Sequence, residues 1–134
     1  MGDDAGRIRS IVFDCESPYQ LAQFWAAALH YEVRPYSDDD LARLRADGID
    51  RIEDDPSVAI DPLEPGKPTV WFNLVPETKT VKNRVHIDVN LDDETEVDVL
   101  VALGAKVLRD PIPDERWFVL ADPEGNEFCA FPPR

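Results

Sequence analysis

One short pattern occurs twice in this chain and limits the folds that it can adopt. Residues 85–91 read Val-His-Ile-Asp-Val-Asn-Leu, an alternation that predicts a strand with one apolar and one polar face. Residues 10–17 show the same design 76 positions earlier, so that Ser10 corresponds to His86 and Asp14 to Asn90. Each segment then leads into residues with helical spacing. The repeat predicts a chain built from two similar halves.

Both predicted helices have recognisable start signals. Residues 17–20, Ser-Pro-Tyr-Gln, have the composition of a capping box with proline at the first helical position. In the second half, Asp93 and Glu96 form the equivalent pair. The first helix is expected to end near His30, where glycine would be more usual because the backbone there is left-handed.

Three strands are expected after each helix, at 31–36, 57–63 and 69–75 and again at 105–109, 116–121 and 127–131. Residues 72–76 and 128–132 also match, at an offset of 56, which pairs Asn73 with Cys129. The sequence therefore predicts an α+β fold, a single domain over 1–134 made of two βαβββ modules at about 7–76 and 84–132. The modules are expected to be related by a pseudo-two-fold axis and to form a cup-shaped mixed β-sheet with the helices outside.

An acidic insertion interrupts the first half. Residues 38–64 contain ten Asp and Glu against three Arg, which indicates a solvated surface element with a short helix over 38–46. The whole chain has a formal net charge of −14, which argues against nucleic acid as a partner. No apolar run approaches 18 residues, so no membrane association is expected and the protein is predicted to be cytoplasmic. Two cysteines fit neither a disulfide framework nor a paired metal motif.

Candidate site residues lie on the polar face of the strand at 85–91. His86 could act as a general base, with Asp88 or Glu127 as a partner carboxylate whose pKa is raised if the cup is dry. The alternative is that this face is only solvated, as one face of an antiparallel sheet often is.

Three segments carry a family resemblance: residues 14–25 around Asp-Cys and Ser-Pro, residues 79–88 ending in Val-His-Ile-Asp, and residues 122–129, Asp-Pro-Glu-Gly-Asn-Glu-Phe-Cys. On these the chain resembles the vicinal oxygen chelate superfamily, the glyoxalase, bleomycin-resistance and dioxygenase fold, and its glyoxalase-like domain proteins in particular. The resemblance covers nearly the whole chain. It implies a fold and leaves the activity open, because the superfamily hosts unrelated chemistries.

The resemblance also implies positions for a divalent metal, contributed by the first, fourth, fifth and eighth strands. Carried onto this chain they are Ser10, Asn73, His86 and Cys129. Only His86 is an ordinary ligand, so no metal cofactor is expected and the four positions are interpreted as vestigial. Zinc held by His86 and Cys129 remains the alternative.

The resulting hypothesis is a protein that binds a small molecule, of the sequestering type found among bleomycin-resistance relatives. Its ligand would contact Ser10, Asn73, His86, Cys129 and Trp71. The alternative is a glyoxalase-like lyase or isomerase that uses His86 as general base, with or without a metal. Because relatives of this fold commonly dimerise, a homodimer is a candidate assembly.

Overall fold

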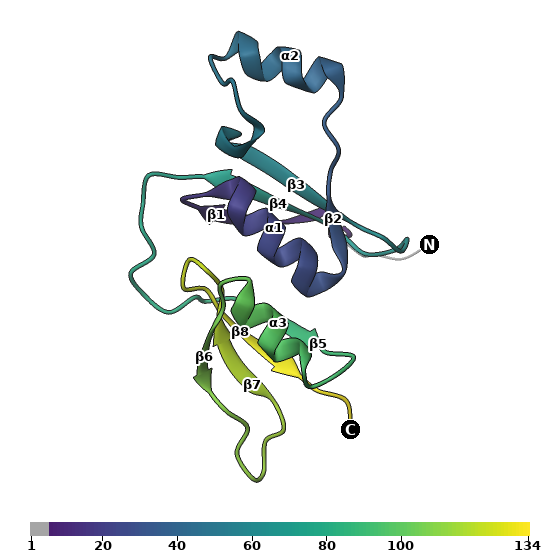
Figure 1. Ribbon diagram of the computed structural model, residues 1–134, viewed down its shortest axis with the longest axis vertical. Helices are drawn as coiled ribbons and strands as arrows, with labels where there is room; N and C mark the ends of the chain where they lie inside the picture. The colour runs from purple at the N-terminus through teal and green to yellow at the C-terminus, as the bar shows by residue number, and fades with distance from the viewer. Residues whose placement is uncertain (1–5) are drawn as a thin grey trace.

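The computed structural model describes residues 6–134, which form two modules placed end to end (Figure 1). The first module contains β1 (Ser10–Cys15), α1 (Pro18–Leu29), β2 (Tyr31–Val33), α2 (Asp38–Ala46), the 3-10 helix η1 (Ile52–Asp54), β3 (Ser57–Pro62) and β4 (Thr69–Leu74). The second contains β5 (Asp88–Asn90), α3 (Glu96–Ala102), β6 (Lys106–Arg109), β7 (Phe118–Ala121) and β8 (Glu127–Phe131).

Each module has its own four-stranded mixed sheet. The strand orders are β1-β4-β3-β2 and β5-β8-β7-β6, with the first pair of each sheet parallel and the others antiparallel. The same βαβββ path therefore occurs twice, and the predicted fold class is confirmed. Within residues 6–134 the sheets do not pair with each other, so the predicted cup has two separate halves.

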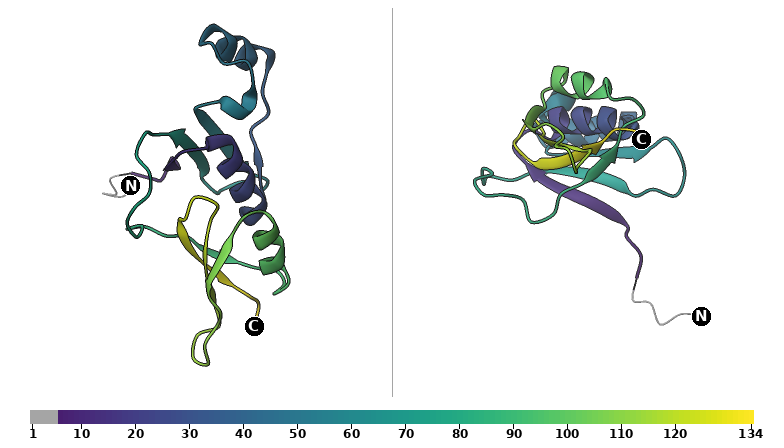
Figure 2. Two further views of the ribbon diagram at one scale, coloured as in Figure 1. Left: turned by 60° about the vertical axis from the view of Figure 1, so that its left-hand side comes forward. Right: turned by 90° about the horizontal axis from the view of Figure 1, so that it is seen from below.

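Both core helices lie on the same side of the sheets (Figures 1 and 2). Leu21, Phe24 and Trp25 of α1 are spaced for one helical face and are at most 2% exposed. They pack on the apolar faces of the strands, where Phe72 of β4 and Phe128 of β8 are equally buried. The opposite faces are mixed: in the first sheet the paired Asp14 and Asn73 share this face with the paired Val12 and Trp71.

The turn between β7 and β8 joins the second module to the first through hydrogen bonds of two acidic side chains. The buried Trp25 indole donates a hydrogen bond of 2.9 Å to Asp122 Oδ2. The carboxylate of Glu124 accepts from the backbone N–H groups of Glu16 and Ser17, at 2.8 and 2.9 Å. Glu124 therefore satisfies donors just before α1, and the predicted cap by the Ser17 side chain is wrong because that side chain makes no capping hydrogen bond.

The acidic insertion forms α2 at the predicted residues and projects from the end of the molecule (Figures 1 and 2). The helix begins with a capping box in which Ser37 and Asp40 exchange hydrogen bonds. None of its residues is buried. This agrees with a surface element that is stabilised locally.

Two of the predicted strands, the second and the fifth, are at least three residues shorter than expected. The second ends at Val33 rather than at residue 36, and the fifth begins only at Asp88, so His86 lies in the segment that leads into it. Over residues 6–134, no helix combines the length and apolar character needed to cross a bilayer.

Candidate functional site

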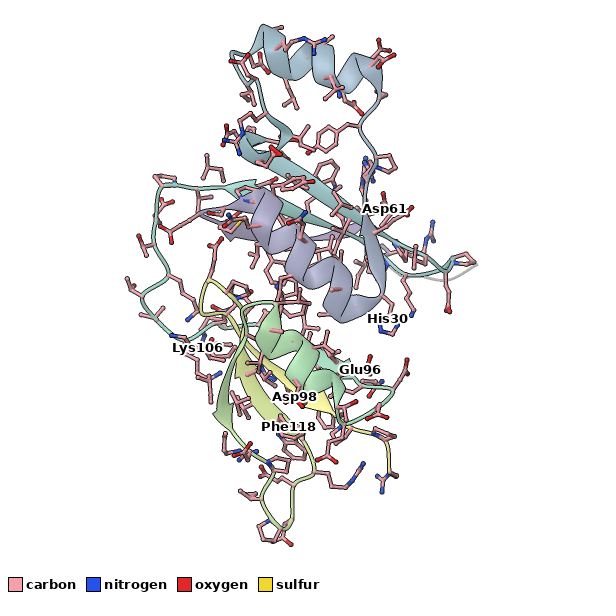
Figure 3. All side chains as sticks on the ribbon, viewed as in Figure 1. His30, Asp61, Glu96, Asp98, Lys106 and Phe118 are labelled. Atoms are coloured by element: carbon pink, nitrogen blue, oxygen red, sulfur yellow. The ribbon has the colours of Figure 1, made fainter. Side chains whose placement is uncertain are left out.

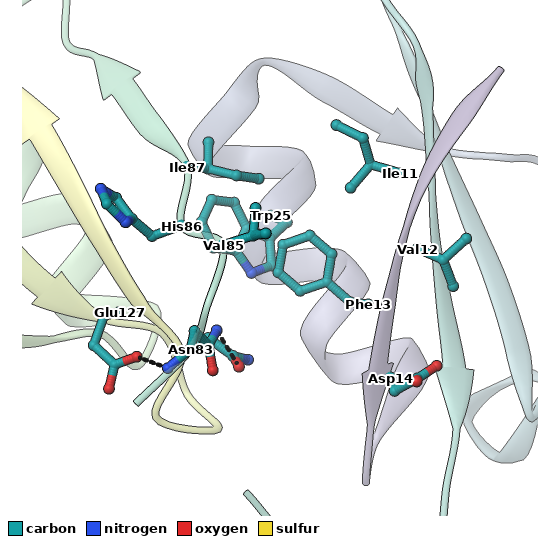
Figure 4. Close-up of a pocket in the computed structure, with 11 residues that line it drawn as sticks. Ile11, Val12, Phe13, Asp14, Trp25, Asn83, Val85, His86, Ile87 and Glu127 are labelled. Atoms are coloured by element: carbon teal, nitrogen blue, oxygen red, sulfur yellow. Dashed lines mark hydrogen bonds between the residues drawn. The ribbon is translucent and has the colours of Figure 1, made fainter. Parts of the chain in front are cut away.

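A cavity of about 230 Å³ lies between β1 of the first module and the segment before β5 of the second (Figure 4). Its lining consists of Ile11, Val12, Phe13, Asp14, Trp25, Asn83, Val85, His86, Ile87, Asn126 and Glu127. Trp25 is 1% exposed and packs against Phe13 with ring centroids 5.4 Å apart, which gives the cavity an aromatic wall. Polar groups surround this wall from both modules.

His86 lines this cavity and stands beside a carboxylate. Its Nε2 is 3.5 Å from Asp88 Oδ1, because side chains two residues apart in extended backbone lie on the same side. Both side chains are about half exposed. The apolar face predicted for residues 85–91 is formed only in part: Val89 is buried and Ile87 packs against the core, but Val85 is 80% exposed. Val85 precedes β5, so its backbone is not part of the sheet, and its side chain does not pack beneath the helices.

Cys129 lies next to Asp88, since the two residues are partners in the parallel pairing of β5 with β8. Burial raises the pKa of the Cys129 thiol, and the nearby Asp88 carboxylate, which accepts a hydrogen bond from the thiol, raises it further. The thiol is therefore protonated at neutral pH. The donor atoms of His86, Asp88 and Cys129 all lie within 4.8 Å of one another.

Glu127 lines the cavity, and donors from the segment before His86 hold its carboxylate. Its carboxylate accepts hydrogen bonds from the Asn83 backbone N–H at 2.9 Å and from Lys79 Nζ at 3.1 Å. These donors, the Asn83 N–H first, hold the pKa of Glu127 below its usual value. The expectation of a raised pKa is therefore wrong for Glu127, which fixes the segment before His86 in place.

Ser10 and Asn73 are not gathered around His86. Asn73 Oδ1 accepts a hydrogen bond of 2.7 Å from Ser57 within the first sheet, and among residues 6–134 neither Ser10 nor Asn73 lines the cavity. The strand registers also correct the predicted correspondence. Asp14 pairs with Asn73 and Asp88 with Cys129, so superposing Asn73 on Cys129 places Asp14 on Asp88.

The offset between β1 and β5 is therefore 74 rather than 76, and Val12 rather than Ser10 corresponds to His86. An alternating pattern repeats every two residues, so it fixes which face a side chain is on and does not distinguish registers two residues apart.

Trp71 lines a second and larger cavity of about 540 Å³, between the polar face of the first sheet and α2. The Arg34 guanidinium lies 5.1 Å from the centroid of the Trp71 ring and donates two hydrogen bonds to Asp61, at 2.8 and 2.9 Å. The hydrogen bonds from Arg34 are the main reason why the pKa of Asp61 is lowered. Of the residues assigned from the sequence to one cup, His86 and Glu127 therefore line the first cavity and Trp71 the second. Ser10, Asn73 and Cys129 line neither.

Sequence reasoning missed Asn83, Asp14 and Phe13 as cavity residues. Phe13 could have been found, since it lies on the apolar side of the first strand next to a predicted helix. Asn83 could not have been found from the sequence, because its position depends on a hydrogen bond to Glu127, which is 44 residues away.

Comparison with protein families gives a match to the model of a glyoxalase-like domain, over residues 10–131. The chain belongs to this glyoxalase-like domain family. Solved structures agree on the fold. The glyoxalase-like domain aligns with the fosfomycin resistance protein FosX from Mesorhizobium loti at 13% identity and a TM-score of 0.62, covering 98% of this chain and 92% of that one.

A glyoxalase/bleomycin resistance protein/dioxygenase family enzyme from Burkholderia phytofirmans aligns at 19% identity and a TM-score of 0.58, with 92% and 96% coverage. A point mutant of FosX from Listeria monocytogenes, in complex with Mn(II) and a dihydroxypropylphosphonic acid, aligns at 13% identity and a TM-score of 0.61, with 98% and 95% coverage. These identities establish the vicinal oxygen chelate fold and no activity. Among curated proteins, no match was found.

A divalent metal is implied by the fold of this glyoxalase-like domain, and its residues suit one kind of ion. Imidazole, thiolate and carboxylate are all zinc ligands, whereas a thiol is a poor ligand for the oxygen-preferring Mg²⁺ and Mn²⁺. His86, Asp88 and Cys129 would hold the ion, after the thiol loses its proton. A zinc ion there would supply Lewis acidity toward a ligand oxygen.

Proposed function

We propose that this glyoxalase-like domain binds a small metabolite in the cavity between its modules. The observation that carries the proposal is the composition of that cavity: an aromatic wall of Phe13 and Trp25, with His86, Asn83 and Asp14 around it. A few polar groups on an apolar surface are typical of ligand sites. The volume of about 230 Å³ is below the roughly 300–1,000 Å³ of sites for drug-sized ligands and favours a compact ligand.

The proposal is tested by screening small oxo acids, hydroxy acids and aldehydes for an increase in the melting temperature. His86→Ala should weaken the affinity of a hit about tenfold, since a lost hydrogen bond costs about 1.5 kcal/mol. His30→Gly removes the other histidine, which lies outside this cavity, and should leave the affinity unchanged. Equal affinities of wild type and His86→Ala would contradict the assignment.

A second candidate function is supported by the contact between His86 and Asp88. A carboxylate 3.5 Å from an imidazole can orient it and stabilise its cation, as required of a general base in a lyase or isomerase. The corresponding assay follows solvent deuterium exchange at the carbon next to the carbonyl of each hit, by proton NMR. His86→Ala should slow exchange by about 10²–10⁴-fold. A ligand that binds without deuterium exchange would contradict the enzyme function and support the binding function.

We propose further that the protein forms a homodimer. Val12 on the edge strand β1 and Val85 before β5 are 52% and 80% exposed, and unpaired strand edges with apolar side chains favour association. A dimer would cover them. Light scattering of the wild type and of a Val12→Lys, Val85→Lys variant should report a dimer and a monomer, respectively.

A further inference from the structure

His30 occupies a backbone conformation that is unusual for its residue type. It follows α1 with φ of 57° and ψ of 46°, and within residues 6–134 it is the one non-glycine residue with positive φ. Glycine adopts this conformation without steric cost, whereas a side chain costs about 1 kcal/mol. The histidine side chain extends from the end of the first module toward the second (Figure 3).

Two carboxylates of the second module, those of Asp92 and Glu96, lie near this imidazole. His30 Nε2 is 3.6 Å from Glu96 Oε2, at the start of α3. The other oxygen of Glu96 accepts from the backbone N–H groups of Asp92 and Asp93, so the carboxylate is held in position. The donor atoms of His30, Asp92 and Glu96 all lie within 4.8 Å of one another. Within residues 6–134, no hydrogen bond uses the Asp92 carboxylate, which leaves it available as a ligand.

We propose that His30, Asp92 and Glu96 form a divalent transition-metal site, for which zinc is the probe ion, joining the two modules outside the cavity. One imidazole and two carboxylates suit zinc, which accepts nitrogen and oxygen ligands and takes water in the remaining position. Ligand atoms about 2.1 Å from a tetrahedral ion lie about 3.4 Å apart, close to the 3.6 Å that already separates His30 and Glu96. Asp92, whose carboxylate oxygen lies within 4.8 Å of the other two donor atoms, supplies the third ligand.

The charge around the site also favours a cation. Residues 92–98 contain five acids, Asp92, Asp93, Glu94, Glu96 and Asp98, and no base. His30 and Glu96 are partly exposed, with side-chain exposures of 61% and 30%, so an ion reaches them from solvent. Because His30 follows α1 of the first module, whereas Asp92 and Glu96 belong to the second, the bound ion stabilises the contact between the modules.

The experiment uses a parent variant that lacks the other candidate cluster, His86→Ala with Cys129→Ser, freed of metal by a chelator. Titration with zinc should give one ion per chain. At free zinc 100-fold above Kd, the melting temperature should rise by roughly 5–10 °C. The cobalt-loaded parent should lack the thiolate-to-cobalt charge-transfer absorption, which a site using Cys15 would show.

Adding His30→Gly should weaken zinc binding at least about tenfold, without lowering the melting temperature of the metal-free protein, because glycine suits φ of 57°. Asp92→Asn should weaken binding in the same way and leaves the His30–Glu96 contact intact. A parent that binds no zinc overturns the proposal, as does equal zinc affinity in the parent and in these variants. Neither result bears on ligand binding at His86, which is measured separately.

Discussion

The hydrogen bond from Trp25 to Asp122 should account for much of the stability of the contact between the modules. Asp122 is 2% exposed and its carboxylate accepts four hydrogen bonds, from Trp25 Nε1, Asn126 Nδ2 and the backbone N–H groups of Glu124 and Asn126. Trp25→Phe removes one donor and several buried ring atoms. A hydrogen bond to a charged group contributes about 1.5–3 kcal/mol, and the cavity adds about 1 kcal/mol. The expected loss in the free energy of unfolding is therefore about 3 kcal/mol.

The assay is urea unfolding at pH 7 followed by far-UV circular dichroism, which does not depend on the tryptophan that is replaced. Trp117→Phe is the matched control, since Trp117 is half-buried against Phe131 and its indole makes no hydrogen bond within residues 6–134. It should cost less than about 1 kcal/mol. A double-mutant cycle of Trp25→Phe with Asp122→Asn should give a coupling of about 1.5 kcal/mol. Equal losses for the two tryptophan variants, or additive effects in the cycle, would refute the reasoning.

Three further outcomes are expected. Glu127→Gln should lower the free energy of unfolding by about 1 kcal/mol at pH 7. Because the pKa of Glu127 is lowered in the folded state, the difference from wild type should persist above the unfolded pKa of about 4.3 and vanish as the pH falls through the folded-state pKa. Urea unfolding from pH 7 to 3 measures this difference. Asp38→Asn with Asp39→Asn should change stability by less than about 0.5 kcal/mol, since α2 buries none of its residues, and a larger loss in the same assay would show that α2 contributes to the fold. Burial raises the pKa of Cys15 to about 12, so a thiol reagent at pH 8 should modify Cys129 in the native protein and Cys15 only after unfolding, as read by mass spectrometry.

The fold was predictable because each element has a local signal. Alternation marks the strands, and the apolar stripe of α1 gives its buried face. Ser37 and Asp40 at the start of α2 form their capping box from residues three apart, so even the boundary of that exposed helix agrees with the sequence. These features depend on neighbours along the chain.

The candidate site was less predictable because its geometry depends on residues far apart in the sequence. Glu124 satisfies backbone donors 107 and 108 residues away, which replaces the local cap expected of Ser17. Glu127 is fixed by Asn83 and Lys79, and this reverses the expected direction of its pKa shift. The register of β5 against β8 is set by packing across the sheet, which an alternating pattern does not encode.

The separation of the two sheets affects how the chain acquires its structure during synthesis. Among the described residues, every strand pair of the first sheet lies between residues 10 and 74, so this sheet can complete its pairing while the second half is still on the ribosome. Asp122 is translated 97 residues after Trp25, and until Asp122 and Glu124 are made the Trp25 indole N–H and the backbone donors before α1 lack their native acceptors. The nascent first half would expose the aromatic surface of Phe24 and Trp25 that Phe128 later covers, which makes it the stage most prone to aggregate.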